Sequence, residues 1–95
     1  MSAMKSEQTI QPVLAQGLHV RPARQITELV AKYEAKATLC SGDFTADAGS
    51  VLELLGLGLF GPVTIQVSAE GNDASEVVAE LCSFFQSLEQ EQSKS

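Results

Sequence analysis

The most informative segment of this 95-residue chain reads Gly17-Leu18-His19-Val20-Arg21-Pro22-Ala23. Pro22 suits the first turn of a helix, because the amides of that turn have no helical partner and a missing N–H costs little. The residues that follow predict such a helix, because apolar side chains recur at three- and four-residue steps: Ala23, Ile26, Leu29, Val30 and Tyr33. The single histidine of the chain is therefore expected at a helix N-terminus.

Outward from this helix, the pattern predicts a small α+β domain. Strands are expected at residues 9–14, 37–40, 44–46 and 63–67, a short helix after Ser50, and a last helix with apolar residues from 77 to 88. Ser50 and Glu53 have the spacing of a capping box, and Pro12, which cannot donate to a ladder, favours a sheet edge for the first strand. The order β-α-β-β-α-β-α predicts a four-stranded, mostly antiparallel sheet with three helices on one face.

The length fits one domain, and the charge excludes some classes of partner. Twelve acidic against six basic residues give a net charge of −6, which disfavours binding to nucleic acid or to an anionic membrane. No run of about 18 apolar residues occurs, so a soluble, cytoplasmic protein is expected. Polar ends predict flexible tails at residues 1–7 and 89–95 around a domain at residues 8–88. Cys40 and Cys82 lack a metal-site or redox spacing and are expected to be buried, reduced thiols.

One motif match is rejected on its context. Residues 56–61 read Gly-Leu-Gly-Leu-Phe-Gly, which matches the G-x-G-x-x-G pattern of dinucleotide sites. In such sites the glycines follow a strand and open a helix, whereas here a helix is predicted before them and a strand after them. The match therefore predicts no nucleotide site.

His19 has the surroundings of a phosphoryl acceptor. The unpaired amides of a first helical turn attract an anion and disfavour the imidazolium, which keeps a ring nitrogen free near neutral pH. A phosphoryl group on that nitrogen would meet the backbone N–H groups of Val20 and Arg21 and the planar guanidinium of Arg21. The simpler alternative is that His19 only caps the helix and that Arg21 is a solvated charge.

Segment 17–23 resembles the active-site signature of the HPr family, the small histidine phosphocarriers of the bacterial phosphoenolpyruvate-dependent sugar phosphotransferase system (PTS). The resemblance covers about residues 8–88, because further family motifs fall in place: Ser50, Leu57-Gly58-Leu59 and Ser68-Ala69-Glu70-Gly71. It implies the HPr-like open-faced β-sandwich. It also implies a carrier rather than an enzyme, with no bound cofactor or metal. His19 would take a phosphoryl group on Nδ1 from phosphorylated enzyme I and pass it to a histidine of a IIA-type component, while Arg21 steadies the phosphoryl oxygens.

The resemblance further implies a monomer with a small docking surface, which suits weak and fast association. The family positions of this surface are occupied here by Val20, Arg24, Val51, Leu52 and Leu55. Leu52 and Leu55 are equally consistent with core packing. By contrast, Leu54 and Leu57 are expected in the core.

Ser50 aligns with the serine that a dedicated kinase phosphorylates in many members of the family. Gly49 and Glu53, however, stand where basic residues are usual in the family. An N-cap role worth about 1 kcal/mol explains Ser50 without a kinase. Regulatory phosphorylation of Ser50 is therefore the less favoured of two interpretations.

The charges near the histidine also depart from the family pattern. Arg21 and Arg24 are nearly the only cations there, and Glu28 and Glu53 are expected close by. This favours a specialised paralogue, such as a nitrogen-branch carrier or a unit of a fused phosphotransferase. The alternative function is a regulatory module whose phosphorylation state tunes binding to a regulator or an enzyme. A third interpretation, an unrelated α/β ligand-binding domain, would make the extended resemblance a coincidence.

Overall fold

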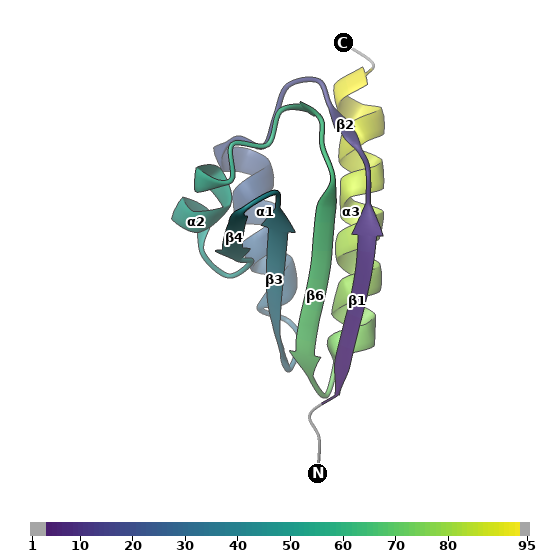
Figure 1. The fold of residues 1–95 in the computed structure, drawn as a ribbon. Coiled ribbons are helices and arrows are strands. Elements are labelled where there is room, and N and C mark those ends of the chain that lie inside the picture. The colour runs from purple at the N-terminus through teal and green to yellow at the C-terminus, as the bar shows by residue number, and fades with distance from the viewer. Residues whose placement is uncertain (1–3, 94–95) are drawn as a thin grey trace.

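The computed structural model describes residues 4–93, which form an antiparallel four-stranded sheet with three helices on one face (Figure 1). The strands are β1 (Lys5–Ile10), β2 (Val13–Leu14), β3 (Ala35–Ser41), β4 (Phe44–Asp47), β5 (Gly61–Pro62) and β6 (Ile65–Gly71). The helices are α1 (Val20–Val30), α2 (Val51–Gly56) and α3 (Ala74–Ser93). The main sheet has the order β1-β6-β3-β4, and β2 pairs with β5 in a separate two-stranded sheet. The predicted α+β open-faced sandwich is confirmed.

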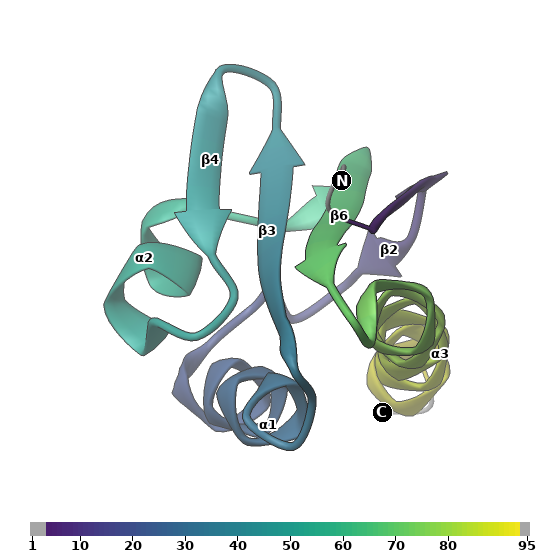
Figure 2. The same cartoon turned by 90° about the horizontal axis from the view of Figure 1, so that it is seen from below.

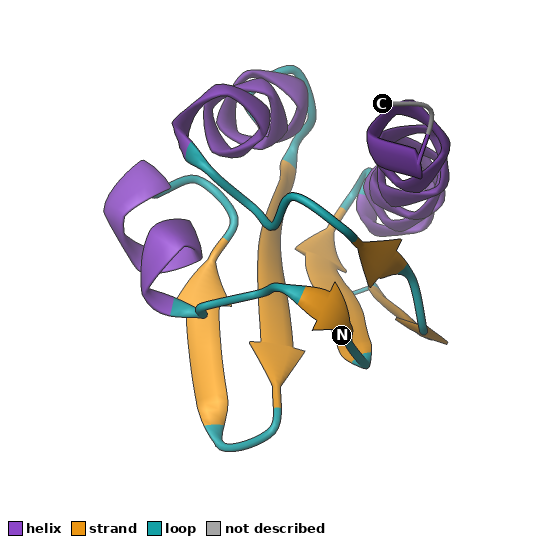
Figure 3. Cartoon of the chain, turned by 90° about the horizontal axis from the view of Figure 1, so that it is seen from above, coloured by secondary structure: helices purple, strands orange, loops and turns teal. Residues whose placement is uncertain are grey.

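The helices cover one face of the sheet because the apolar strand residues alternate with polar ones. Figures 2 and 3 show α1 and α3 next to each other on this face, with α2 beside β4. The strands contribute a buried layer from alternate positions: Ala37, Leu39, Ala46, Ile65, Val67 and Ala69. The helices fill the other side with fully buried side chains: Ile26, Leu54, Val77, Leu81 and Phe85.

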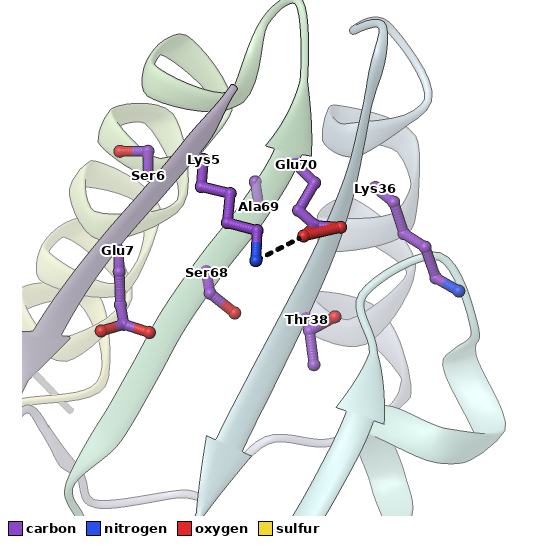
Figure 4. Close-up of a pocket in the computed structure, with 8 residues that line it drawn as sticks. All are labelled: Lys5, Ser6, Glu7, Lys36, Thr38, Ser68, Ala69 and Glu70. Carbon is purple, nitrogen blue, oxygen red and sulfur yellow. Dashed lines mark ion pairs between the residues drawn. The ribbon is translucent and has the colours of Figure 1, made fainter. Parts of the chain in front are cut away.

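The opposite face of the sheet is open and carries alternating charges. Lys5 and Lys36 both lie opposite Glu70 in the strand register, and Lys5 Nζ is 3.1 Å from Glu70 Oε1 (Figure 4). These residues line a shallow hollow of about 410 Å³ together with Thr38 and Ser68. Opposite charges that face each other across neighbouring strands favour this register, by well under about 1 kcal/mol for an exposed pair.

The first strand differs from its prediction at both ends. β1 begins at Lys5 and ends at Ile10, and the chain turns at Pro12 before β2 starts. Polar residues form most of β1, and they pair with β6 through the backbone, which a hydrophobic pattern cannot detect. The carbonyl of Pro12 accepts a hydrogen bond from the Val63 N–H at 3.1 Å. The edge position predicted for the first strand is confirmed by the strand order.

The predicted tails also differ from the structure. Residues 5–7 belong to β1, and α3 continues through residues 89–93, so regular structure extends past the expected boundaries at 8 and 88. The helix extends because Glu89 and Gln92 hydrogen-bond to the segment that precedes α1. Residues 1–3 and 94–95 of the predicted tails lie outside the described residues.

Smaller differences concern element ends and the thiols. α1 ends at Val30, so Tyr33 lies beyond the helix that its spacing predicts, and β6 begins at Ile65 rather than at residue 63. Cys40 and Cys82 are free thiols, but they are half-buried rather than buried. Desolvation raises the pKa of the Cys82 thiol.

The short helix α2 has only one half of the predicted capping box. Ser50 Oγ accepts a hydrogen bond from the Glu53 N–H at 3.3 Å, as predicted. Glu53 Oε1, however, accepts from the Asp47 N–H at 2.9 Å, because the Ser50 N–H donates to the Asp47 carbonyl instead. Glu53 therefore closes the loop between β4 and α2. Residues 56–61 end this helix and lead into β5, which confirms that their glycines do not open a helix.

Two leucines of α2 offer a matched test of this packing. Leu54→Ala removes a fully buried side chain and should lower the free energy of unfolding by about 2 to 5 kcal/mol. Leu52 is 82% exposed, so Leu52→Ala should change it by less than about 0.5 kcal/mol. Urea unfolding of both variants checks this, and equal losses would contradict the packing described for α2.

Candidate functional site

His19 is the N-cap residue of α1, and its side chain is exposed. Its backbone is extended, with φ −101° and ψ −170°, and its carbonyl accepts a hydrogen bond from the Ala23 N–H at 3.0 Å. The imidazole makes no capping hydrogen bond to the helix. The backbone of His19 therefore starts the helix while its ring is free for other chemistry, which contradicts the alternative of a capping histidine.

The first turn of α1 offers backbone donors next to this ring. Val20 and Arg21 are the first two helical residues, and their N–H groups have no carbonyl one turn earlier within the helix. Pro22 follows in the helix and has no N–H, so it leaves no donor unsatisfied at the third position. The positive end of the helix dipole adds to these donors, so the site favours an anion over a cation.

A tight turn brings His19 to this position. The Gly17 N–H donates to the Leu14 carbonyl at 3.0 Å, and Gly17 has a φ of +76°, which side chains rarely permit. The next N–H, of Leu18, donates to the Leu59 carbonyl at 3.0 Å. A Cβ on Gly17 would lie 3.0 Å from Phe60 Cδ2 and 3.1 Å from the Leu59 carbonyl oxygen. Gly17 is thus required for its backbone conformation and also for close packing against the loop at 57–60.

Arg21 has a partner that the sequence did not reveal. Its Nη2 donates to Glu91 Oε1 at 2.9 Å, across 70 residues of sequence, and both side chains are mostly exposed. Both residues lie at the end of the molecule where α1 starts and α3 ends (Figure 1). An exposed ion pair of this kind contributes only about 0 to 1 kcal/mol, so a phosphoryl group that arrives can compete for the guanidinium.

The residues around His19 form a hollow of about 510 Å³. It is lined by the N-cap residue and by residues from the first three turns of α1: His19, Val20, Arg21, Arg24, Gln25 and Glu28. Arg24 and Glu28 bring opposite charges to one hollow, so the predicted proximity of Glu28 to the histidine is seen in the structure. A wide and open hollow of mixed charge suits contact with another protein surface better than enclosure of a small ligand.

The predicted docking residues differ in exposure. Val20 and Leu52 are 54% and 82% exposed, whereas Val51 and Leu55 are half-buried against the core. Leu54 and Leu57 are buried, as predicted. Sequence reasoning missed Phe60, which is 69% exposed and packs next to Gly17. Its position directly after the buried Leu59, in an apolar run between two glycines, was the available signal.

Two further structural findings concern metals and membranes. Within residues 4–93, no group of three or more His, Cys, Asp or Glu side chains is arranged to hold a metal ion. In the same part of the chain, no helix combines the length and the apolar character needed to cross a bilayer.

Comparison with known proteins matches residues 6–87 to the family model described as "PTS HPr component phosphorylation site". A multiphosphoryl transfer protein of Xanthomonas campestris is 42% identical over 72 residues, which are 76% of this chain but 9% of that protein. The phosphocarrier protein HPr of Vibrio cholerae is 33% identical over 86% of this chain and 96% of its own length. The crystal structure of an HPr from Thermoanaerobacter tengcongensis superposes with a TM-score of 0.80 at 26% identity, covering 87% of this chain and 93% of that one.

The close approach at Gly17 is testable against a second glycine. Gly42 has a φ of +60° and no atom within 4 Å of the position that a Cβ would take, so Gly42→Ala introduces only the strain of the left-handed backbone. Gly17→Ala introduces the same strain and a clash with Leu59 and Phe60, so it should cost at least about 1 kcal/mol more. Urea unfolding measures both; equal costs would show that the loop at 57–60 moves away without penalty.

Proposed function

Because this chain belongs to the HPr family of PTS phosphocarriers, we propose that it carries a phosphoryl group on His19. One observation carries the proposal: the His19 ring is exposed and makes no capping hydrogen bond, while its backbone begins α1. A nucleophile must be accessible to a second protein, and a charged product needs donors nearby. The position of His19 meets both requirements.

The proposed donor is the phosphohistidine of enzyme I, and the transfer is a displacement at phosphorus. The lone pair of His19 Nδ1 forms the new N–P bond as the N–P bond of the donor breaks. The electron pair of the broken bond returns to the donor imidazole, so one phosphoryl group moves and no other group is consumed. In the second transfer, a histidine of a IIA-type component attacks the phosphorus. Its N–P bond forms as the bond to His19 Nδ1 breaks, and the electron pair of that bond returns to the His19 imidazole.

The first turn and Arg21 are proposed to stabilise the phosphoryl group after transfer. The N–H groups of Val20 and Arg21 stand at the helix terminus nearest the ring, and they gain charge-assisted hydrogen bonds when a dianion is present. The Arg21 guanidinium forms an ion pair with Glu91 in the unphosphorylated chain. We propose that it shifts to the phosphoryl oxygens, because a doubly charged group attracts it more strongly than one exposed carboxylate does.

Partner docking is proposed to use the exposed apolar residues around the hollow. Val20 and Leu52 are the exposed apolar members of the predicted set, and Phe60, next to Gly17, adds a further exposed apolar side chain. Arg24 supplies a cation at the rim, while Val51 and Leu55 support the surface from partly buried positions. A surface with so few apolar side chains fits a transient complex, as a carrier with two successive partners requires.

The choice of PTS branch is a separate proposal. Glu28 lies in the same hollow as Arg24, and Glu53 lies in the first turn of α2, so basic residues do not surround the histidine. This charge balance favours a carrier with its own dedicated partners, either in a nitrogen branch or beside a fused phosphotransferase. Ser50 is held as the N-cap of α2, so a kinase would have to break the bond between its Oγ and the Glu53 N–H.

Labelling with radioactive phosphoenolpyruvate and purified enzyme I tests the carrier function. The wild-type chain should gain acid-labile label, and His19→Ala should gain none. Arg21→Ala should still be labelled, but about ten- to hundredfold more slowly, because a charge-assisted hydrogen bond contributes about 1.5 to 3 kcal/mol. Lys36→Ala, which removes a cation from the open sheet face, should behave as wild type. Label that persists in His19→Ala would remove the proposal, and a chase onto purified IIA proteins identifies the branch.

A docking role for Leu52 predicts a change in affinity rather than in chemistry. Leu52→Ala should raise the KM for enzyme I about fivefold and leave kcat unchanged, because the side chain contacts only the partner. Met4→Ala removes a similarly exposed apolar side chain at the start of β1, at the other end of the molecule from the start of α1, and serves as the control (Figure 1). Steady-state transfer kinetics measure both variants. An unchanged KM in Leu52→Ala would place docking elsewhere.

A further inference from the structure

The last turn of α3 contains a buried polar side chain, Gln92. It is 4% exposed and is the only polar residue buried to this degree within residues 4–93. The matched family region ends at residue 87, so the family resemblance does not account for this side chain. Burial of an amide is costly unless its donors and acceptor are hydrogen-bonded, so its partners show what it does.

Gln92 bonds to two main-chain groups just before His19, the N–H of Gln16 and the carbonyl of Gly17. Its Oε1 accepts a hydrogen bond from the Gln16 N–H at 3.0 Å, and its Nε2 donates to the Gly17 carbonyl at 2.8 Å. The side-chain amide thus joins an N–H and a carbonyl of adjacent residues in the turn before α1. A primary amide is suited to this task, since it offers an acceptor and a donor at once, whereas a carboxylate has no donor.

The neighbours of Gln92 hold the same segment. Glu89 Oε1 accepts from the Val13 N–H at 3.0 Å, and Glu91 pairs with Arg21. One helical turn therefore contacts the chain before and after His19, at positions 13, 16, 17 and 21. Of these contacts, the bond from Gln92 Nε2 to the Gly17 carbonyl is buried and the bond from the Gln16 N–H to Gln92 Oε1 is partly buried, whereas those of Glu89 and Glu91 are exposed. The two bonds of Gln92 are therefore the better shielded from water.

We propose that Gln92 is a positioning residue for phosphoryl transfer, and this inference rests on the proposed function of His19. Gln92 fixes the turn at Gln16 and Gly17, and this turn sets the direction from which the chain enters the N-cap. Gly17 has a positive φ, and because glycine adopts many other conformations as readily, contacts with the rest of the molecule must select this one. When the support is lost, the His19 ring samples orientations in which Nδ1 does not face the donor phosphorus or the first-turn amides.

The test uses the full chain with Gln92→Leu, which keeps the volume but loses both hydrogen bonds. Gln90→Leu, an exposed position in the same helical turn, is the matched control. Gln92→Leu should lower the kcat of transfer from enzyme I about tenfold with little change in KM, because Gln92 lies behind the docking surface and not on it. Amide hydrogen exchange at Gln16 should become at least about tenfold faster in this variant. Gln90→Leu should change neither quantity.

A second variant, Gln92→Glu, keeps the acceptor for the Gln16 N–H and sets a carboxylate against the Gly17 carbonyl. It should lower kcat while leaving Gln16 exchange closer to wild type, which separates the contribution of the two hydrogen bonds. The inference is wrong if Gln92→Leu is folded by circular dichroism and transfers at the wild-type kcat, or if only its KM changes. A wild-type chain that gains no label would instead contradict the function of His19 itself, so the two failures are distinguishable.

Discussion

The hydrogen bond from the Leu18 N–H to the Leu59 carbonyl joins the segment before α1 to the loop after α2, next to His19. It forms only because Gly17 turns the chain with a positive φ and lets the loop at 57–60 approach within van der Waals distance. The bond places the start of α1 against the loop that connects α2 to β5. His19 follows directly, so its exposure and its place at the helix terminus are consequences of this turn.

Most of the fold could be predicted from local patterns, because these patterns reflect burial. The three-and-four spacing behind Pro22 indicated α1, and the polar break at Gly42 indicated the hairpin of β3 and β4. The first half of β1, residues 5–8, was not predicted because these residues are polar and their pairing with β6 is a backbone interaction. The helical end of α3 was not predicted for a related reason. Residues 89–93 are polar, and their contacts are with a segment more than 70 residues away in sequence.

In the candidate site, too, the residues that are adjacent in sequence could be predicted and the distant ones could not. His19, Val20 and Arg21 are consecutive, so their relation to the helix terminus could be read from spacing alone. Glu91 and Gln92 reach the same site from the other end of the chain, and no local pattern relates residue 91 to residue 21. Glu53 shows the limit of a sequence motif. Its spacing from Ser50 predicts that its carboxylate accepts from the Ser50 N–H, but that N–H donates to the Asp47 carbonyl. The Glu53 carboxylate accepts from the Asp47 N–H instead.

The interactions around His19 fall into two classes with different consequences for a carrier. Those behind the histidine, at Gln16, Gly17 and Leu18, are hydrogen bonds of main-chain groups to the buried Gln92 side chain or to the Leu59 carbonyl, and such bonds are costly to break. Those in front, the Arg21–Glu91 ion pair and the exposed Leu52 and Phe60, are solvated and individually weak. A group that must be accepted from one protein and released to another needs a fixed nucleophile and exchangeable surroundings. Under the proposed function of His19, the fixed part is supplied by Leu59 and Gln92, which are distant from the 17–23 segment in sequence and bond to positions 16 to 18.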